Sequence, residues 1–193
     1  MCLFLFAACS YRQTAVDFSR IALEEGDLVF RRGIGVKSQA VLSADTAGIY
    51  SHSGIVVRLD SGYRIIHVTS GEREKGEKED RIKIESPETF FAADRAEHGA
   101  VYRIKEARNY AAEAASHAKR LLEKGVLFDH DYVLEDTTQL YCTELVWYVY
   151  QLAGKDITNG KRSELNNFPL FSGVYIFPSD LYGNNEFNLI YKF

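Results

Sequence analysis

The sequence predicts an α+β domain, and three segments carry that prediction. Strand-like runs at 52–58 and 63–68 flank a turn signal and indicate an antiparallel hairpin. Alanine and leucine recur at helical spacing across 107–122, and the small residues of that face allow close packing against a sheet. A second apolar helical pattern begins at Cys142 and stops at Gly154. The length of 193 residues fits one domain, or one domain with a short tail.

The composition is that of an ordinary globular protein. Hydrophobic residues make up 46% and charged residues 26%, which is unlike a disordered chain. The formal net charge of −4 gives no electrostatic footprint for nucleic acid or for an anionic membrane surface. We therefore expect no nucleic-acid partner. Tyr and Phe number 12 each, which predicts aromatic packing or an aromatic-lined groove.

Residues 1–9 form an uncharged apolar segment with small residues before Cys9. The segment is too short to cross a bilayer, which takes about 20 apolar residues. It is similar to the end of a secretory signal, and it resembles the lipobox of bacterial lipoproteins, in which that cysteine is lipidated after cleavage. No Lys or Arg precedes it, and Phe6 stands where Leu is usual, so an apolar strand is the alternative. We expect an exported protein, periplasmic or anchored to the membrane through Cys9, with 10–24 as a tether and 25–193 as the folded domain.

The remaining elements follow from local patterns. A turn signal precedes a first strand at 28–31, and glycines at both ends of 33–48 indicate a short helix between loops. The dense mixed charge of 71–85 indicates a solvated loop or an extended hairpin. Residues 86–91 can cap a short helix, and 100–104 alternates like a strand.

The C-terminal part is expected to close the sheet. Residues 166–173 read as a loop, whereas 174–177 and 187–191 are strand-like, with Pro-Ser-Asp-Leu at 178–181 between them.

The hairpin turn sets the register of two histidines. A two-residue turn at Asp60-Ser61 places Gly54 opposite His67. His52 lies on the same face as Gly54 because side chains alternate along a strand. His52 and His67 are then diagonal neighbours, about 7–8 Å apart between backbones and within side-chain reach. A three-residue turn would separate them.

Cys142 stands at the start of a helix, where the positive end of the helix dipole favours a thiolate. A nearby imidazole can serve as its proton acceptor, and a second polar group can fix the imidazole's tautomer. Free backbone N–H groups of the first turn can bind an oxyanion.

Each of these residues also has a purely structural explanation. A lone cysteine on an apolar face is usually core, His52 can be a satisfied histidine at a strand start, and His67 an exposed cross-strand residue. A zinc site is not expected, because only three ligands are visible and no C-x-x-C pair occurs. The residues alone leave catalysis and packing equally open.

Four segments together resemble a known group of enzymes. They are 26–30 (GDLVF), 50–57 (YSHSGIVV), 141–146 (YCTELV) and 178–182 (PSDLY), and the resemblance spans about 25–185. The group is that of the permuted papain-like enzymes of the YiiX/YaeF type, circularly permuted relatives of the NlpC/P60 cell-wall peptidases. The resemblance implies a papain-like α+β fold, with a small antiparallel sheet or barrel packed on helices.

The resemblance also implies roles for the reactive residues. It makes Cys142 the nucleophile and His52 the general base. Members of the group often carry a glutamate on the strand after the histidine strand, and His67 occupies that place here. A neutral histidine can orient His52 but cannot stabilise an imidazolium as a carboxylate does, so a weaker activity or a shifted pH optimum is expected.

Further residues are expected to bind the oxyanion or the substrate. These are Tyr141, Thr143, Ser51 and Tyr132. Relatives carry a tyrosine near the acidic loop, and Phe128, Tyr132 and Tyr141 are the positions that can match it.

The sequence thus predicts an exported cysteine hydrolase that cleaves an amide bond through an acyl-enzyme, without cofactor or metal. Its substrate would be a cell-wall peptide, an amino-acid amide or a lipid-linked amide. The alternatives are a lipid acyltransferase or N-acyl amide hydrolase, like the lecithin:retinol acyltransferase group, and a non-catalytic binding module. Specificity is expected to lie in loops 32–50, 70–98 and 155–173.

Overall fold

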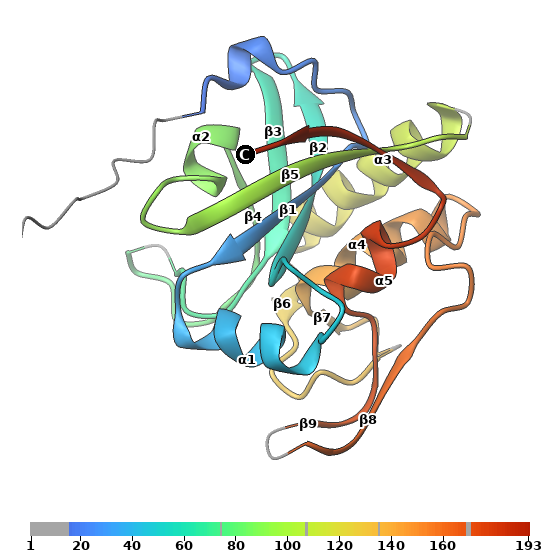
Figure 1. Ribbon diagram of the computed structural model, residues 1–193. Helices are drawn as coiled ribbons and strands as arrows, with labels where there is room; N and C mark the ends of the chain where they lie inside the picture. Colours follow the sequence, from blue (N-terminus) through green and yellow to red (C-terminus); the bar gives the residue numbers. More distant parts are fainter. Residues whose placement is uncertain (1–15, 74, 107, 135, 169–170) are drawn as a thin grey trace, which may run out of the picture.

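The computed structural model describes residues 16–193 except 74, 107, 135, 169 and 170. Its centre is an antiparallel six-stranded sheet with strand order β10-β5-β1-β2-β3-β4 (Figure 1). The strands of this sheet are β1 (Leu28–Gly33), β2 (His52–Leu59), β3 (Gly62–Val68), β4 (Ile82–Glu85), β5 (Ala96–Ile104) and β10 (Phe187–Lys192).

Helices and two short strand pairs surround the sheet. The helices are η1 (Phe18–Arg20), α1 (Val36–Ala44), α2 (Pro87–Phe90), α3 (Arg108–Lys124), α4 (Cys142–Leu152) and α5 (Pro178–Tyr182). The pairs are β6 (Leu127–Phe128) with β7 (Gln139–Leu140), and β8 (Ser163–Phe168) with β9 (Phe171–Tyr175). The predicted α+β class, an antiparallel sheet packed on helices, is confirmed. None of the described helices is long and apolar enough to cross a membrane.

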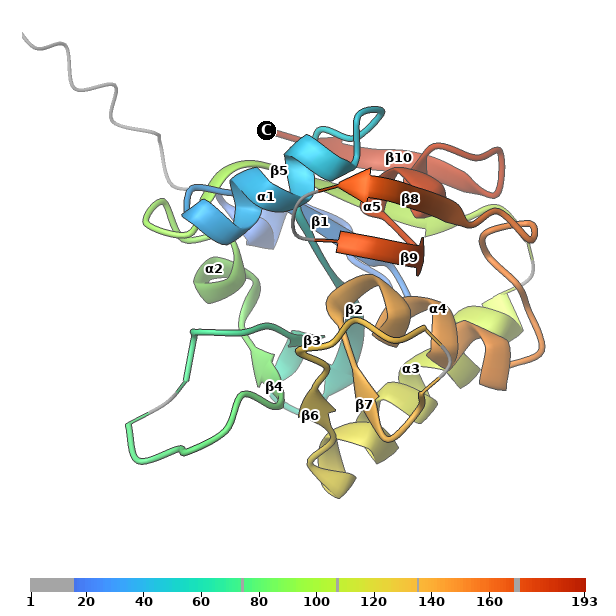
Figure 2. The same ribbon diagram turned by 90° about the horizontal axis from the view of Figure 1, so that it is seen from below.

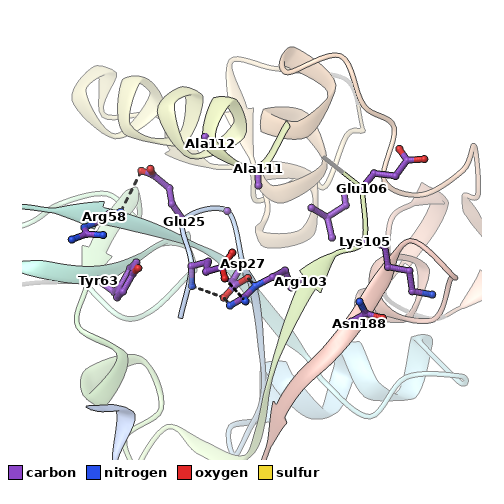
Figure 3. A pocket seen from close by; sticks show the side chains of 13 residues that line it. Glu25, Asp27, Arg58, Tyr63, Arg103, Lys105, Glu106, Ala111, Ala112 and Asn188 are labelled. Atoms are coloured by element: carbon purple, nitrogen blue, oxygen red, sulfur yellow. Dashed lines mark hydrogen bonds and ion pairs between the residues drawn. The ribbon is translucent and has the colours of Figure 1, made fainter. Parts of the chain in front are cut away.

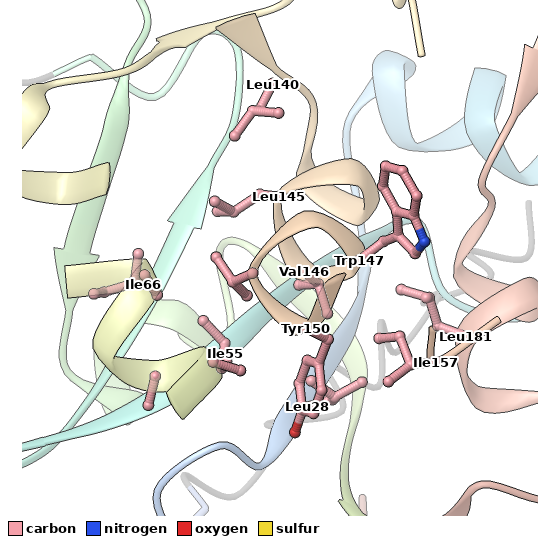
Figure 4. Close-up of a cluster of buried hydrophobic side chains, with 14 of the residues drawn as sticks. Leu28, Ile55, Ile66, Leu140, Leu145, Val146, Trp147, Tyr150, Ile157 and Leu181 are labelled. Carbon is pink, nitrogen blue, oxygen red and sulfur yellow. The ribbon is translucent and has the colours of Figure 1, made fainter. Parts of the chain in front are cut away.

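The main core lies between the sheet and helices α3 and α4 (Figure 4). Strand residues such as Leu28, Ile55 and Ile66 meet the apolar face of α4 there, and each fully buried side chain contributes about 1.5–3 kcal/mol. The buried alanines of α3 let that helix approach the sheet, as its small-residue face predicts. At the far end of α4, the Tyr150 hydroxyl donates to the carbonyl oxygen of Gly26 at 2.7 Å.

A smaller core covers the other face of the sheet. Phe90 and Phe91 of the α2 region pack there against strand residues such as Val56. The ring of Phe18 stacks on that of Phe91, with centroids 5.2 Å apart. Residues 16–24, the described part of the expected tether, therefore lie against this face, while 1–15 fall outside the described residues.

The predicted hairpin register is confirmed. Ile55 pairs with Ile66 and Leu59 with Gly62, which sets Gly54 opposite His67. A Cβ atom at Gly54 would lie 2.8 Å from Cγ2 of Ile65 and 3.2 Å from Cβ of His67. Glycine at position 54 thus leaves the room that His67 occupies.

The segment 166–173 differs from the prediction, because β8 and β9 form a hairpin where a loop is expected. This hairpin lies outside the main sheet, so its strands lack the apolar alternation of a half-buried strand. The charged segment 71–85 ends in β4, whose alternating Ile82 and Ile84 pair with β3.

Candidate functional site

Cys142 is the first residue of α4, and local contacts fix that start. Tyr141 is the N-cap in extended conformation (φ −95°, ψ 170°). The side chain of Glu144, three residues on, accepts the N–H of Tyr141 at 3.5 Å, completing a capping arrangement. The hydroxyl of Thr143 donates to the carbonyl oxygen of Ile176. These contacts hold the first turn of α4 in place. The backbone N–H groups of this turn, which starts at Cys142, have no partner within the helix.

His52, His67 and Glu85 form a hydrogen-bonded row across three neighbouring strands. Nε2 of His52 lies 2.9 Å from Nδ1 of His67, and Nε2 of His67 lies 3.1 Å from Oε2 of Glu85. An ionised carboxylate accepts only, so His67 donates to Glu85 through Nε2–H and accepts from His52 at Nδ1. His52 must then carry its proton on Nε2. Its Nδ1 is left as an unprotonated acceptor, which is the state a general base requires.

Glu85 is the site residue that sequence reasoning missed. His67 lies on β3, and the structure supplies a carboxylate one strand further on, at the end of β4. The alternation Ile82-Lys83-Ile84-Glu85 is the signal that could have located it, because it marks a strand that must pair beside His67. Glu85 thus places a carboxylate behind the two histidines, which the sequence analysis does not predict.

Three cations surround this carboxylate and a second one. Glu85 lies 2.9 Å from Arg95 and 3.1 Å from Lys83. Glu72 bridges the same two cations and also pairs with Arg31, whose guanidinium lies over the Phe90 ring. Burial raises the pKa of Glu85, but the hydrogen bond from His67 and the charges of Arg95 and Lys83 outweigh it and hold that pKa well below its ordinary value. Glu85 is thus ionised at neutral pH.

Both histidines are neutral at pH 7. Burial lowers the pKa of His52 well below its ordinary value, and the positive charge of Arg31 lowers it further. Burial also lowers the pKa of His67, although the hydrogen bond to Glu85 opposes this. The ring of His52 stacks on Phe90 with centroids 5.5 Å apart, which keeps it on the α2 side of the sheet edge.

The thiol of Cys142 is also neutral in the resting site. Burial raises its pKa, and the N–H and hydroxyl of Ser53, the N–H of Thr143 and the charge of Arg31 lower it only in part. Ser53 is fully buried, and both its N–H and its hydroxyl face the thiol of Cys142. The structure therefore favours a neutral thiol, over a preformed thiolate, on the same cleft as the neutral imidazole of His52.

A cleft of about 510 Å³ opens at the end of the sheet where these residues lie (Figure 2 views this end). We call it the main cleft. Its lining includes five of the predicted site residues, namely Cys142, His52, Tyr141, Tyr132 and Ser51. Helix α1 forms one wall through Val36, Lys37 and Val41. Thr143 lines a small adjoining cavity with Cys142.

The remaining predicted residues have distinct positions. His67 is fully buried behind His52 and contacts it by hydrogen bonding. The hydroxyl of Ser51 accepts the N–H of Gly33 at 2.9 Å, which ties the start of β2 to the end of β1. Tyr132, with φ of 54°, lines both cavities, and burial raises its pKa to about 12. Cys9 lies outside the described residues.

A larger cavity of about 600 Å³ lies elsewhere, between the β1 turn, α3 and β5 (Figure 3). Its most buried polar groups are hydrogen-bonded to one another. Arg103 donates to both carboxylate oxygens of Asp27 at 2.7 and 2.8 Å and to Glu24 at 2.6 Å. It contains no thiol or histidine, so we assign the reactive site to the main cleft in spite of its smaller volume.

The neutral histidines predict a pH dependence of stability. Their pKa values are lowered in the folded chain, so the unfolded chain binds more protons once the pH falls below the ordinary value of 6.5. The free energy of unfolding should be constant above that pH with respect to these groups. Below it, each histidine should remove as much as about 1.4 kcal/mol per pH unit.

Urea denaturation of the chain from pH 7.5 to pH 5 measures this slope. The variant His52→Gln keeps an amide N–H for His67 and removes one titrating group, so its slope should be shallower. His98→Gln, a change at a half-exposed histidine of β5, is the matched control. Equal slopes in all three chains would contradict the assignment of neutral buried histidines.

The described residues contain no group of three or more His, Cys, Asp or Glu side chains suited to hold a metal ion. His52 and His67 turn their bonded nitrogens toward each other and toward Glu85, rather than toward a common point. This donor set does not fit a metal centre, and no step below passes through one.

Comparison with known proteins identifies the fold. No protein-family model matches the sequence, and no curated protein matches it. A solved structure does match: the crystal structure of the metalloprotein yiiX from Escherichia coli O157:H7, DUF1105. The two share 21% identity and a TM-score of 0.70, over 88% of this chain and 97% of that one. The chain therefore has a YiiX-like fold, an antiparallel sheet packed on helices.

Proposed function

We propose that this chain is a cysteine hydrolase of the permuted papain-like type, which cleaves an amide bond in a peptide or a related amide. One observation carries the proposal. A thiol at a helix start and a histidine row with a defined tautomer open on the same cleft. The YiiX-like fold, and the order of the histidine strand before the cysteine helix, support the permuted arrangement.

The reaction would proceed by general-base attack. Sγ of Cys142 adds to the substrate carbonyl carbon while its proton passes to Nδ1 of His52. The positive charge that forms on His52 is stabilised through His67 by the ionised Glu85. Backbone N–H groups of the first turn of α4 receive the oxyanion.

The same groups complete the reaction. The imidazolium of His52 returns its proton to the leaving amine as the C–N bond breaks and the thioester forms. Water then attacks the thioester with His52 as base, releasing the carboxylic acid and restoring the thiol of Cys142. The Arg31 charge next to the site favours the developing thiolate, which offsets part of the cost of its burial.

The test is a hydrolysis screen of the full chain against muropeptides, aminoacyl amides and N-acyl amino acids, with product release followed by mass spectrometry. Cys142→Ala serves as the blank. A trapped acyl group on Cys142, found by intact-mass analysis during turnover, is the expected signature. Turnover that survives in Cys142→Ala would rule out the thiol mechanism.

We also propose that the protein is exported and tethered through a lipid on Cys9. The support is the apolar segment before that cysteine. Expression of the full chain and of Cys9→Ala in a bacterium, with labelled fatty acid, tests this. The Cys9→Ala variant should lose both the fatty-acid label and its recovery in the membrane fraction.

A further inference from the structure

Two cavities of different character meet at Cys142. The main cleft carries His52 and the charged side chains Arg31 and Glu72. The second cavity, about 40 Å³ in volume, is small, partly open and almost wholly apolar. We call it the apolar slot; it is lined by Val41 and Ala44 of α1, Tyr175, Ile176 and Pro178 of the β9–α5 segment, and Cys142 of α4.

Two polar side chains at the slot, those of Thr143 and Tyr141, already have hydrogen-bond partners. The hydroxyl of Thr143 donates to the carbonyl oxygen of Ile176, and that of Tyr141 accepts the N–H of Ile176 at 3.1 Å. A cavity without free polar partners gains nothing from water and favours an apolar group.

The walls of the slot are fixed before any ligand arrives. Asp45, next to Ala44 at the end of α1, accepts the N–H of Ser179 at 3.0 Å and its hydroxyl at 2.5 Å. Helix α1 is thereby tied to α5, the two elements that face each other across the slot. A pre-formed slot selects by size, because its walls cannot move apart without breaking buried hydrogen bonds.

The side of the scissile bond follows from proton transfer. His52 must reach the leaving nitrogen, so the amine part of the substrate lies in the main cleft, which His52 lines. His52 is not among the described residues that line the slot. The slot therefore faces the acyl part of the substrate, on the other side of the scissile bond.

We propose that the apolar slot is the subsite for the side chain of the residue that supplies the scissile carbonyl, and that it takes a small aliphatic side chain of alanine to valine size. This rests on the proposed hydrolase function and narrows its substrate class. The slot excludes aromatic side chains and long acyl chains, for which its volume of about 40 Å³ is too small. It thus argues against a long-chain lipid as the acyl donor.

The experiment measures how fast Cys142 is alkylated by chloromethyl ketones of N-acetyl-alanine, -valine, -leucine and -phenylalanine. In each case Sγ displaces chloride, a C–S bond forms and the thiol proton leaves through His52. Iodoacetamide is the reference, because it is too small to need the slot. The alanyl and valyl reagents should react at least about tenfold faster than the phenylalanyl reagent, after each rate is divided by the iodoacetamide rate.

Two matched variants locate the effect. Ala44→Leu fills the slot and should slow the valyl reagent about tenfold while the iodoacetamide rate changes little. Ala47→Leu makes the same change at an exposed position just beyond α1 and should leave all rates as they are. If Ala44→Leu does not fold, the order of rates in the unaltered chain still decides whether the slot is the subsite.

The outcomes separate the two proposals. A phenylalanyl reagent as fast as the alanyl one, or an effect of Ala44→Leu equalled by Ala47→Leu, overturns the slot assignment even where amides are hydrolysed. The expected order of rates in a chain that hydrolyses no amide supports the subsite and rejects the hydrolase. A Cys142 that iodoacetamide does not modify overturns both.

Discussion

His52→Gln should lower kcat/KM for an amide substrate by about 100-fold to 10,000-fold, the usual contribution of a positioned general base. The amide N–H of glutamine can still donate to Nδ1 of His67, so the variant removes the base without orphaning its neighbour. The variant also loses the stacking of the His52 ring on Phe90. Steady-state kinetics on a substrate found in the screen gives the value.

His98→Gln is the matched control for this prediction. His98 lies on β5 with a side chain that is 53% exposed, and it is not among the described residues that line the main cleft. It should keep the unaltered kcat/KM. A His52→Gln chain that stays within about threefold of the unaltered one would remove His52 from the reaction.

Glu85→Gln should weaken both activity and stability. The carboxylate is only 10% exposed and pairs with Lys83, Arg95 and His67, so its loss leaves Glu72 to neutralise three cations. Removal of one partner from a buried pair costs about 3–5 kcal/mol, and the partial exposure of Arg95 reduces the expected loss here to about 2–3 kcal/mol of unfolding free energy. Urea denaturation at pH 7.5 measures it.

The activity of Glu85→Gln should show a signature that a simple loss of stability does not give. Removal of the negative charge of Glu85 should lower the pKa of His67, which it contacts, and of His52 beyond it. The acidic limb of the pH profile of kcat/KM should therefore move to lower pH while the plateau falls. An unshifted limb would confine Glu85 to a structural role.

Glu97→Gln is the control for Glu85→Gln. Glu97 is 53% exposed and pairs with Arg32, itself 31% exposed. Exposed pairs of this kind contribute little, so the expected change is about 0.5 kcal/mol or less.

The sequence located the elements that carry their own periodicity. The hairpin register follows from a two-residue turn and from alternation, and both survive folding because neither depends on distant residues. The helix that begins at Cys142 is located by its apolar stripe and by Gly154, which follows its end. The two histidines and the cysteine could therefore be brought to one region from the sequence.

What the sequence did not supply depends on distant contacts. Glu85 lies within a run of mixed charges, and only the pairing of β4 with β3 distinguishes it from its solvated neighbours. The protonation state of Cys142 depends on burial, which opposes the helix dipole and is not readable from the first turn of α4. The hairpin β8–β9 has no apolar alternation, and five of its residues whose burial is described, including Glu164, Asn166 and Val174, are exposed.

The histidine row also links the chemistry to the edge of the sheet. It runs at right angles to the strands, and its last member sits at the end of β4, a four-residue edge strand. Edge strands are held by one neighbour and open locally at a lower free energy than the centre of a sheet. Each such opening releases Glu85 from His67, so His67 loses the partner that fixes its proton and with it the tautomer of His52. Under the proposed mechanism, fraying at β4 would lower the fraction of molecules in which His52 is set as a base, while the core around α4 remains intact.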